Sequence, residues 1–254
     1  MSNNKIIHAM VLAAGLGMRM RPLSETTPKP MLNVAGKPMI DWALDSLSNA
    51  GVRHAVINLH WLGEQIKDHT KQRSNPALSF IEENPILETG GGILNALNHG
   101  LLGNGGFYAI NADQIWIDGE TPALEHLANV WDEEKMDVLL LLQPLLSAKG
   151  YDGAGDFNLG SNGRVERRHE NSMGELVFTG VQILSPNLFS APVEQKPGEA
   201  FSLNILYDKA IEQGRLFAIV HDGEWLHIGT PENLIKANEY LTANKPVQAP
   251  GQPS

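Results

Sequence analysis

The chain has 254 residues, of which 42% are apolar and 19% charged, and its net charge is −10. This length and composition suit one well-buried α/β domain with room for a subsidiary lobe. Because the chain contains no cysteine, disulfides, thiol catalysis and thiolate metal sites are excluded. The acidic balance argues against a nucleic-acid partner, since recognition of a phosphate backbone needs an extended basic surface.

The start of the chain gives no targeting signal. MSNNKIIHAMVL lacks the basic start and the uninterrupted apolar core of a signal peptide, and no later run is long enough to cross a bilayer. We therefore expect a cytoplasmic protein without a membrane partner.

Strand and helix patterns alternate over the first 145 residues. Residues 6–12 are apolar without polar alternation, as expected of a strand buried on both faces of a parallel sheet. Pro38 precedes an apolar stripe that begins at Met39, and Gly51 ends that helix. Further strands are expected at 52–59, 78–81, 107–110 and 138–142, and further helices at 61–72, 91–101 and 124–131. This succession predicts a parallel sheet covered by helices on both faces.

The pattern changes after Pro144. Shorter strands are expected at 156–159, 165–168 and 176–184, followed by a helix at 205–213, a strand at 216–220 and a helix at 231–243. Residues 246–254 have too little apolar content to pack, which predicts a mobile tail. Without a repeat or a linker, residues 1–245 should form a single domain.

A glycine turn with cations follows the first strand. Gly15 and Gly17 can bring backbone N–H groups close to an anion, and Arg19, Arg21 and Lys29 come soon after. Residues 11–40 carry a net charge of +3 inside an acidic chain. The segment is therefore suited to binding a small polyanion such as a nucleotide.

Two well-known phosphate loops do not match this segment. The dinucleotide fingerprint needs a third glycine where Met20 stands. The Walker loop needs Ser or Thr after Gly36-Lys37, where Pro38 stands.

The run LAAGLGMRMRPLSETTPKPM instead resembles the signature of the sugar-phosphate nucleotidyltransferases, LAAGxGxRxxP followed by PKP. Met18, where a small residue is usual, is a minor departure. The resemblance implies a Rossmann-like mixed, mostly parallel sheet with helices on both faces. It also implies that Arg19, Lys29 and Asp113 are catalytic. The nucleotide-binding positions would be Leu12, Ala13, Ala14, Gly15, Gly17, Met18, Arg19, Lys29 and Gly91.

Gly91 belongs to the segment Glu88-Thr89-Gly90-Gly91-Gly92, which falls where the family has a second glycine segment that contacts base and sugar. Three glycines are poor helix formers, so they indicate a purpose other than helix stability. A simple tight turn would be the ordinary explanation of three glycines alone. The spacing from the first motif instead favours a segment that contacts the base and the sugar.

Asp113 follows the strand expected at 107–110, and ligands bind at the carboxyl ends of parallel strands. An exposed loop aspartate would be the ordinary explanation. The resemblance makes Asp113 the expected ligand of Mg²⁺, which typically uses one or two carboxylates together with phosphate oxygens and water.

The sequence WLHIGT departs from the family at the second metal ligand. Many members carry WxDxGT, and His227 stands at the position of that aspartate. Mg²⁺ prefers oxygen ligands, so we expect His227 to act through a water molecule or a phosphate rather than by direct ligation. Neither Glu224 nor Asp222 is expected to replace the missing carboxylate. The contrary hypothesis is an impaired enzyme that serves as a binding module.

The sugar-binding positions rest on the resemblance. They are Glu88, Asn111, Gly155, Glu170, Thr179 and Gly180. Residues 1–145 would form the nucleotide-binding part and residues 146–245 the sugar-binding part.

The resemblance implies that a nucleoside triphosphate and a sugar-1-phosphate, with Mg²⁺ as cofactor, give a nucleotide sugar and pyrophosphate. The ETGGG form and the short chain are most similar to bacterial uridylyltransferases that use UTP and N-acetylmuramate-1-phosphate in recycling cell-wall sugar. A mannose- or heptose-1-phosphate guanylyltransferase is the alternative. A non-catalytic nucleotide-sugar sensor is the alternative of another class. The sequence makes no prediction of oligomeric state.

Overall fold

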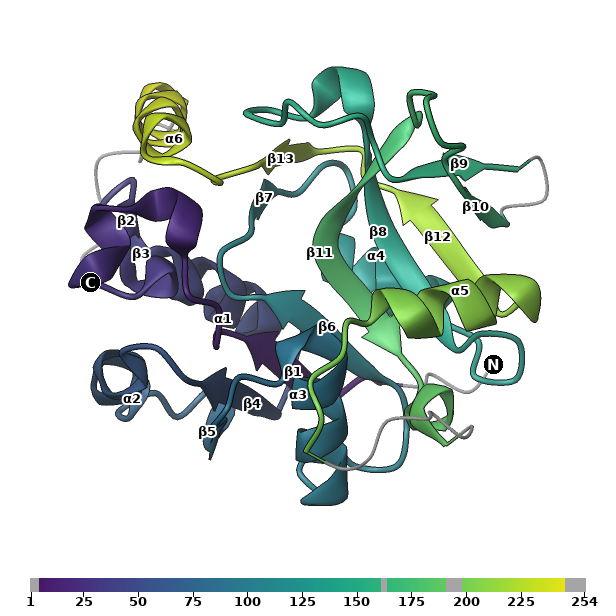
Figure 1. The fold of residues 1–254 in the computed structure, drawn as a ribbon, viewed down its shortest axis with the longest axis horizontal. Coiled ribbons are helices and arrows are strands. Elements are labelled where there is room, and N and C mark those ends of the chain that lie inside the picture. The colour runs from purple at the N-terminus through teal and green to yellow at the C-terminus, as the bar shows by residue number, and fades with distance from the viewer. Residues whose placement is uncertain (1–4, 161–163, 191–197, 245–254) are drawn as a thin grey trace.

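A nine-stranded sheet forms the centre of the molecule (Figure 1). The computed structural model describes residues 5–160, 164–190 and 198–244, so the tail expected at 246–254 lies outside the described residues. The strands of this sheet are β1 (His8–Leu12), β4 (His54–Leu59), β5 (Ala77–Glu82), β6 (Phe107–Asn111), β8 (Val138–Pro144), β9 (Phe157–Leu159), β10 (Val165–Arg167), β11 (Leu176–Leu184) and β12 (Leu216–Val220).

One half of the sheet is parallel. Strands β5, β4, β1 and β6 lie side by side, with Leu12 at the end of β1 paired to Asn58 on one side and Asn111 on the other. Strand β11 then runs antiparallel to both β6 and β8, and β12 pairs parallel with β8. The expected mixed, mostly parallel sheet is therefore confirmed.

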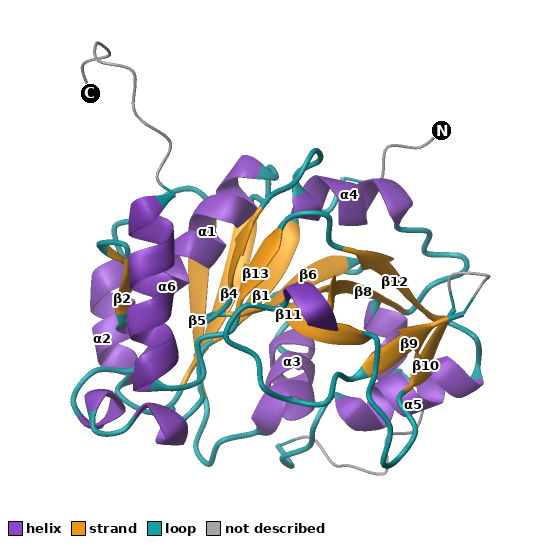
Figure 2. Cartoon of the chain, turned by 90° about the horizontal axis from the view of Figure 1, so that it is seen from above, coloured by secondary structure: helices purple, strands orange, loops and turns teal. Residues whose placement is uncertain are grey.

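Helices cover both faces of the sheet (Figure 2). They are α1 (Met39–Asn49), α2 (Gly63–Thr70), α3 (Glu88–Asn98), α4 (Ala123–Val130), α5 (Asn204–Glu212) and α6 (Pro231–Ala243). Successive side chains of a strand point to opposite faces. Ala9 and Val11 therefore join the core that includes α1 and α4, whereas Met10 joins the core that includes α3 and α5. This double burial explains why β1 lacks polar alternation.

A third, smaller core lies beside the sheet. Two short strands, β7 (Ile115–Ile117) and β13 (Glu224–Leu226), pair antiparallel, and β2 (Asn33–Val34) pairs with β3 (Lys37–Pro38). The buried side chains of this core are Met20, Leu32, Val34, Met39, Ile115, Leu226, Ile228, Ala237 and Leu241. It joins the segment that contains Arg19 and the segment that contains His227 to α6.

The elements expected from the sequence are present with small shifts at their ends, whereas β2, β3 and β7 were not expected. The largest difference concerns α3, which begins at Glu88 instead of about Gly91, so all three glycines lie inside the helix. Across the described ranges, no helix has the length and apolar content needed to cross a membrane.

The pH dependence of stability should report on His8. Burial, and then the nearby charge of His54, lowers the pKa of His8 from its ordinary 6.5. As pH falls through about 6.5, the unfolded chain therefore binds a proton before the folded chain does, and stability is lost. We expect the midpoint temperature of thermal unfolding to fall less for His8→Gln than for wild type between pH 7.5 and pH 5.5. The matched control is the exposed His99→Gln, and an equal loss in His8→Gln and wild type would contradict the assignment.

Candidate active site

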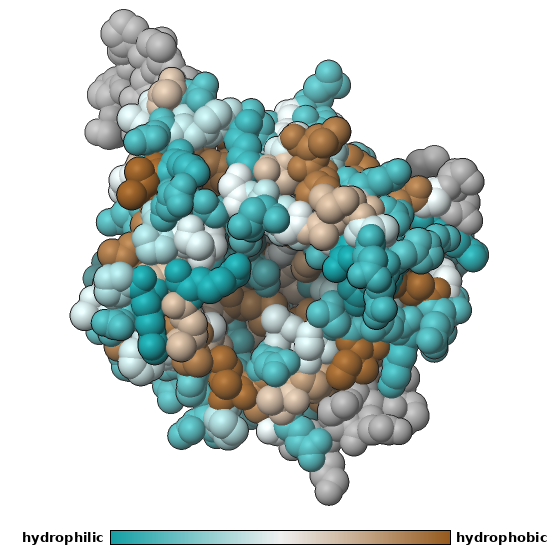
Figure 3. All heavy atoms as spheres, turned by 45° about the horizontal axis from the view of Figure 1, so that its top comes forward, coloured by the Kyte–Doolittle hydropathy of each residue, from teal (hydrophilic) through white to brown (hydrophobic). Residues whose placement is uncertain are grey.

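A cleft lies where β1, β4, β5 and β6 end, and it consists of two connected pockets. The loop pocket, of about 250 Å³, is lined by Leu12, Ala13, Gly15, Gly17, Met18, Arg19, Met20, Lys29, Pro30, Asp113 and Gly229. The helix pocket, of about 220 Å³, is lined by Leu12, Ala14, Gly15, Asn58, Glu83, Ile86, Glu88, Thr89, Asn111 and Asp113. Figure 3 shows a hollow near the middle of one face, with polar and apolar side chains around its rim.

The glycine turn is shaped by its own neighbours. Gly17 adopts φ +61°, a left-handed conformation in which a side chain is strained. A Cβ there would also lie 3.2 Å from the Cβ atoms of Lys29 and Ser24. The Ser24 hydroxyl donates to the Gly17 carbonyl at 2.7 Å. The turn thus packs directly against the segment that contains Lys29.

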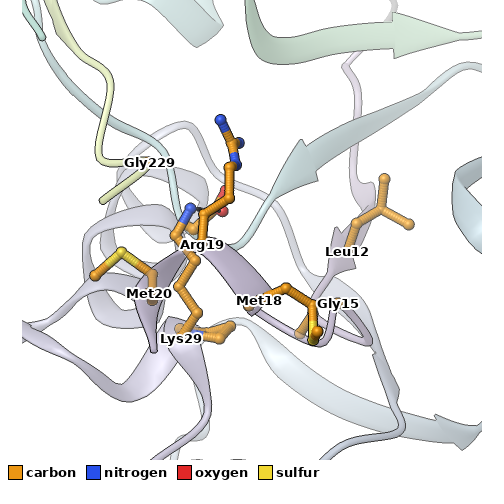
Figure 4. A pocket seen from close by; sticks show the side chains of 11 residues that line it. Leu12, Gly15, Met18, Arg19, Met20, Lys29 and Gly229 are labelled. Atoms are coloured by element: carbon orange, nitrogen blue, oxygen red, sulfur yellow. Dashed lines mark hydrogen bonds and ion pairs between the residues drawn. The ribbon is translucent and has the colours of Figure 1, made fainter. Parts of the chain in front are cut away.

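The residues after the turn face in different directions. Met20, which stands where the dinucleotide fingerprint has glycine, is fully buried in the third core. Arg19 is exposed at the pocket. In Figure 4 the side chains of Arg19 and Lys29 extend in the same direction from the loop. The short helical turn Met18–Met20 therefore separates a core residue from a cation at the cleft.

An ion pair joins the two sides of the loop pocket. The Lys29 ammonium donates to Asp113 Oδ2 at 2.5 Å, and Gln114 Nε2 donates to Oδ1 at 2.9 Å. Burial alone would raise the pKa of Asp113, but the Lys29 charge and these hydrogen bonds outweigh burial and hold the pKa below its ordinary value. Asp113 is therefore an anion at neutral pH.

A buried tryptophan supports this ion pair. Trp225 Nε1 donates to Gln114 Oε1 at 3.0 Å and to the Thr179 carbonyl at 3.1 Å. Trp225 is 1% exposed, and Gln114 in turn orients Asp113. Gln114 was not among the predicted site residues, because no motif marks it.

His227 lies outside the two pockets of the cleft but close to them. Its ring is 5.5 Å from that of Tyr151 and 5.6 Å from that of Trp225, measured between centroids. A Cβ on Gly229 would lie 2.7 Å from His227 Nε2 and 3.4 Å from Arg19 Nη1. Gly229, which lines the loop pocket, thus lies close to both His227 and Arg19, while the His227 side chain lines an adjoining pocket with Lys149 and Tyr240.

The electrostatic surroundings keep His227 uncharged. Burial is the largest cause, and the charges of Lys29 and Arg19 add to it, so that the pKa of His227 falls below 6.5 despite the opposing charges of Asp113 and Asp152. A neutral imidazole offers one donor and one acceptor to water or phosphate.

Neither candidate carboxylate takes the place of the missing aspartate. Glu224 accepts hydrogen bonds from the Tyr240 hydroxyl on α6. Asp222 accepts the backbone N–H of Glu120 at 3.2 Å. Both side chains are therefore bound to other partners.

The side chains at the cleft determine whether a divalent cation could bind there. Within the described residues, no group of three or more His, Cys, Asp or Glu could enclose a metal ion. Asp113 offers an anionic oxygen at a cleft of suitable size. Mg²⁺ often uses only one or two carboxylates and takes its other ligands from phosphates and water. The residues present thus fit a cation that arrives with a phosphate ligand.

The remaining predicted site residues divide into two groups. Glu88 and Asn111 line the helix pocket, and a Cβ on Gly180 would lie 2.8 Å from Asn111 Nδ2. Gly91, Gly155, Glu170 and Thr179 do not line either pocket. The Thr179 hydroxyl donates to the Leu141 carbonyl at 2.8 Å, and Glu170 is exposed.

The glycines of α3 are packed by the chain itself. The N–H groups of Gly90 and Gly91 donate to the Phe201 carbonyl at 2.9 and 3.2 Å. A Cβ on Gly90 would lie 2.3 Å from the Phe201 ring, and a Cβ on Gly91 2.8 Å from the Glu199 carbonyl. Close packing of residues 199–201 therefore accounts for two of the three glycines.

Comparisons with known proteins show which proteins the whole chain resembles. The chain is 37% identical over 238 residues to an N-acetylmuramate alpha-1-phosphate uridylyltransferase of Caulobacter vibrioides, covering 92% of this chain and 96% of that protein. It is 36% identical to one of Neisseria meningitidis serogroup B, covering 93% and 99%. A UDP-glucose pyrophosphorylase structure has the same fold, with a TM-score of 0.74 at 20% identity over 94% of this chain and 100% of that one.

The family model described as nucleotidyl transferase matches residues 8–244. This range includes the glycine turn, Lys29, Asp113 and the His227 segment. The chain belongs to the nucleotidyl transferase family.

Proposed function

We propose that this protein transfers the uridylyl group of UTP to N-acetylmuramate-1-phosphate, giving a UDP-sugar and pyrophosphate. Two relatives that match over almost their whole length bear that name. The observation that supports the chemistry most is the Lys29–Asp113 ion pair, at the junction of the two pockets. It offers a cation for phosphate and an anion for a metal at one place.

The loop pocket suits the triphosphate. A phosphate oxygen of the sugar-1-phosphate attacks the α-phosphorus, and the bond to the bridging oxygen breaks as pyrophosphate leaves. Such a displacement needs alignment and charge neutralisation more than a protein nucleophile. Arg19 presents a planar fork of donors for the leaving pyrophosphate. Lys29 would contact the α-phosphate and the incoming phosphate, while the backbone near Gly15 and Gly17 binds the triphosphate.

Asp113 would hold Mg²⁺ together with phosphate oxygens and water. The cation would supply neutralisation of the charge that builds on the phosphate oxygens. Neutral His227 would orient a water or a phosphate from its position beside Gly229. Gln114 keeps Asp113 in place by its hydrogen bond.

The helix pocket suits the nucleoside, and the sugar would lie beside it. Glu88 and Asn111 line the helix pocket itself, so the sugar would contact them where it adjoins the nucleoside, with Gly180 next to Asn111. We assign nucleotide binding to the part up to about residue 145 and sugar binding to the part that follows it.

A panel of substrates tests the proposal. UTP, GTP, CTP and dTTP would each be combined with N-acetylmuramate-1-phosphate and with mannose- and heptose-1-phosphates, and pyrophosphate release would be measured. We expect release with UTP and N-acetylmuramate-1-phosphate. Release with GTP alone would contradict the uridylyl assignment and favour a guanylyltransferase.

The replacement His227→Asp tests the metal site. It adds a carboxylate beside Asp113, so we expect half-maximal activity at a Mg²⁺ concentration lower by about tenfold or more, as changes around a metal commonly give. The matched control, His169→Asp, adds the same charge at an exposed position and should leave the Mg²⁺ requirement unchanged.

The same assay distinguishes the enzyme from a sensor. Wild type should turn over with Mg²⁺ or Mn²⁺. If turnover with every nucleotide and sugar phosphate appeared only in His227→Asp, the protein would be a binding module that has lost catalysis.

A further inference from the structure

Two buried polar residues lie behind the helix pocket and were not part of any motif. Asn58, near the end of β4, is 2% exposed, and Glu83, just after β5, is 3% exposed. Both still contribute atoms to the pocket wall. Burial of a carboxylate is costly unless hydrogen bonds compensate it, so a pair of this kind calls for a physical reason.

The pair connects two backbone segments of the cleft. The Ala13 N–H donates to Asn58 Oδ1 at 2.8 Å, and Asn58 Nδ2 donates to Glu83 Oε1 at 2.7 Å. Glu83 Oε2 then accepts the N–H of Leu87 at 2.8 Å. A continuous chain of hydrogen bonds thus runs from the glycine turn to the residue that precedes α3.

Glu83 is bound by neutral donors. Among the ion pairs of the described residues, none involves Glu83. Its neighbour Glu82 has an exposed side chain and pairs with Lys67 at 3.7 Å. The hydrogen bonds of the buried carboxyl group therefore link the glycine turn, through Asn58, to the residue that precedes α3.

The third glycine of α3 makes room for this pair. A Cβ on Gly92 would lie 2.5 Å from Glu83 Oε1 and 3.0 Å from Asn58 Nδ2. Gly90 and Gly91 pack against residues 199–201, so Gly92 differs from them in what it accommodates. The ETGGG segment and the LAAG turn are thus shaped around one shared hydrogen-bonded pair.

We propose that Asn58 and Glu83 are positioning residues for the nucleotide: they set the distance between the glycine turn and the start of α3, and so the width of the helix pocket. The inference rests on the proposed function, because it assigns the nucleoside to that pocket. Neither residue lines the loop pocket. They should therefore influence nucleotide binding more than the chemical step at bound substrate.

An exchange of the amide and the carboxylate between positions 58 and 83 tests the proposal. Asn58→Asp places two carboxylates together, and Glu83→Gln leaves one donor facing another. Together, the two changes restore every bond, because the new carboxylate at position 58 accepts from Ala13 and from the new amide at position 83. The amide oxygen then accepts from Leu87. The double variant has the same charge and the same number of hydrogen bonds as wild type.

We expect each single variant to raise the KM and the Kd for UTP by about tenfold or more, since hydrogen bonds to charged groups are among the stronger ones. The kcat at saturating UTP should change by no more than about twofold, and the double variant should return to within about threefold of the wild-type Kd. The matched control is Glu82→Gln, which should bind UTP as wild type does. Titration calorimetry gives Kd, pyrophosphate release gives KM and kcat, and thermal unfolding checks that each variant folds.

Single variants that fold and bind UTP as wild type does would overturn the proposal, as would a double variant whose loss is the sum of the two single losses. Glu83→Gln is isosteric and keeps the test valid if Asn58→Asp does not fold. Absence of UTP binding in wild type would be a failure of the proposed function instead. Binding by wild type with unchanged variants would be a failure of this inference alone.

Discussion

The ion pair between Lys29 and Asp113 is the interaction on which the arrangement of the cleft depends. It joins residues 84 positions apart, one from the segment after the glycine turn and one from the end of β6. Both side chains are largely buried, and a buried charge without a partner is strongly unfavourable. A triphosphate that arrives with a divalent cation would offer each member a new partner of the correct sign. The pair thus neutralises both buried charges when no ligand is bound. It also suits the site to a ligand that combines phosphate groups with a divalent cation.

The fold holds the two ends of this pair by different means. Asp113 is oriented by Gln114, which the buried Trp225 orients in turn. Lys29 lies in a segment that packs on Gly17, and the neighbouring Met20 is buried in the third core with the short strands and α6. The small third core therefore matters for the site, because it joins the segment after the glycine turn to the segment of His227. The large sheet supplies the common edge at which these segments meet.

Much of this could be predicted from the sequence, and the exceptions have physical reasons. The buried strands and amphipathic helices were predictable because periodicity records which faces are buried. The signature pointed to Arg19 and Lys29 and the wider resemblance pointed to Asp113, and the fold brings all three to one pocket. The two-residue strands β2 and β3 could not be predicted, since two residues are too few for an alternating pattern. The ETGGG glycines indicated a special site, but their reasons could not be predicted. Two of them pack against residues 199–201 and the third leaves room for Glu83, and these neighbours come together only in the folded chain. Asn58 escaped notice for the same reason: its partners, Ala13 and Glu83, come together only in the folded sheet.

A crystal structure with Mg²⁺ and a non-hydrolysable UTP analogue would show directly whether the Lys29–Asp113 pair receives the ligand. We expect the triphosphate in the loop pocket, with phosphate oxygens bound by Arg19 and Lys29. The metal should lie on Asp113, with His227 no closer than a water-mediated contact. A triphosphate located elsewhere, such as in the neighbouring groove lined by His60, Leu62 and Glu64, would contradict this expectation. So would a complex in which Lys29 and Asp113 remain paired and neither contacts the ligand.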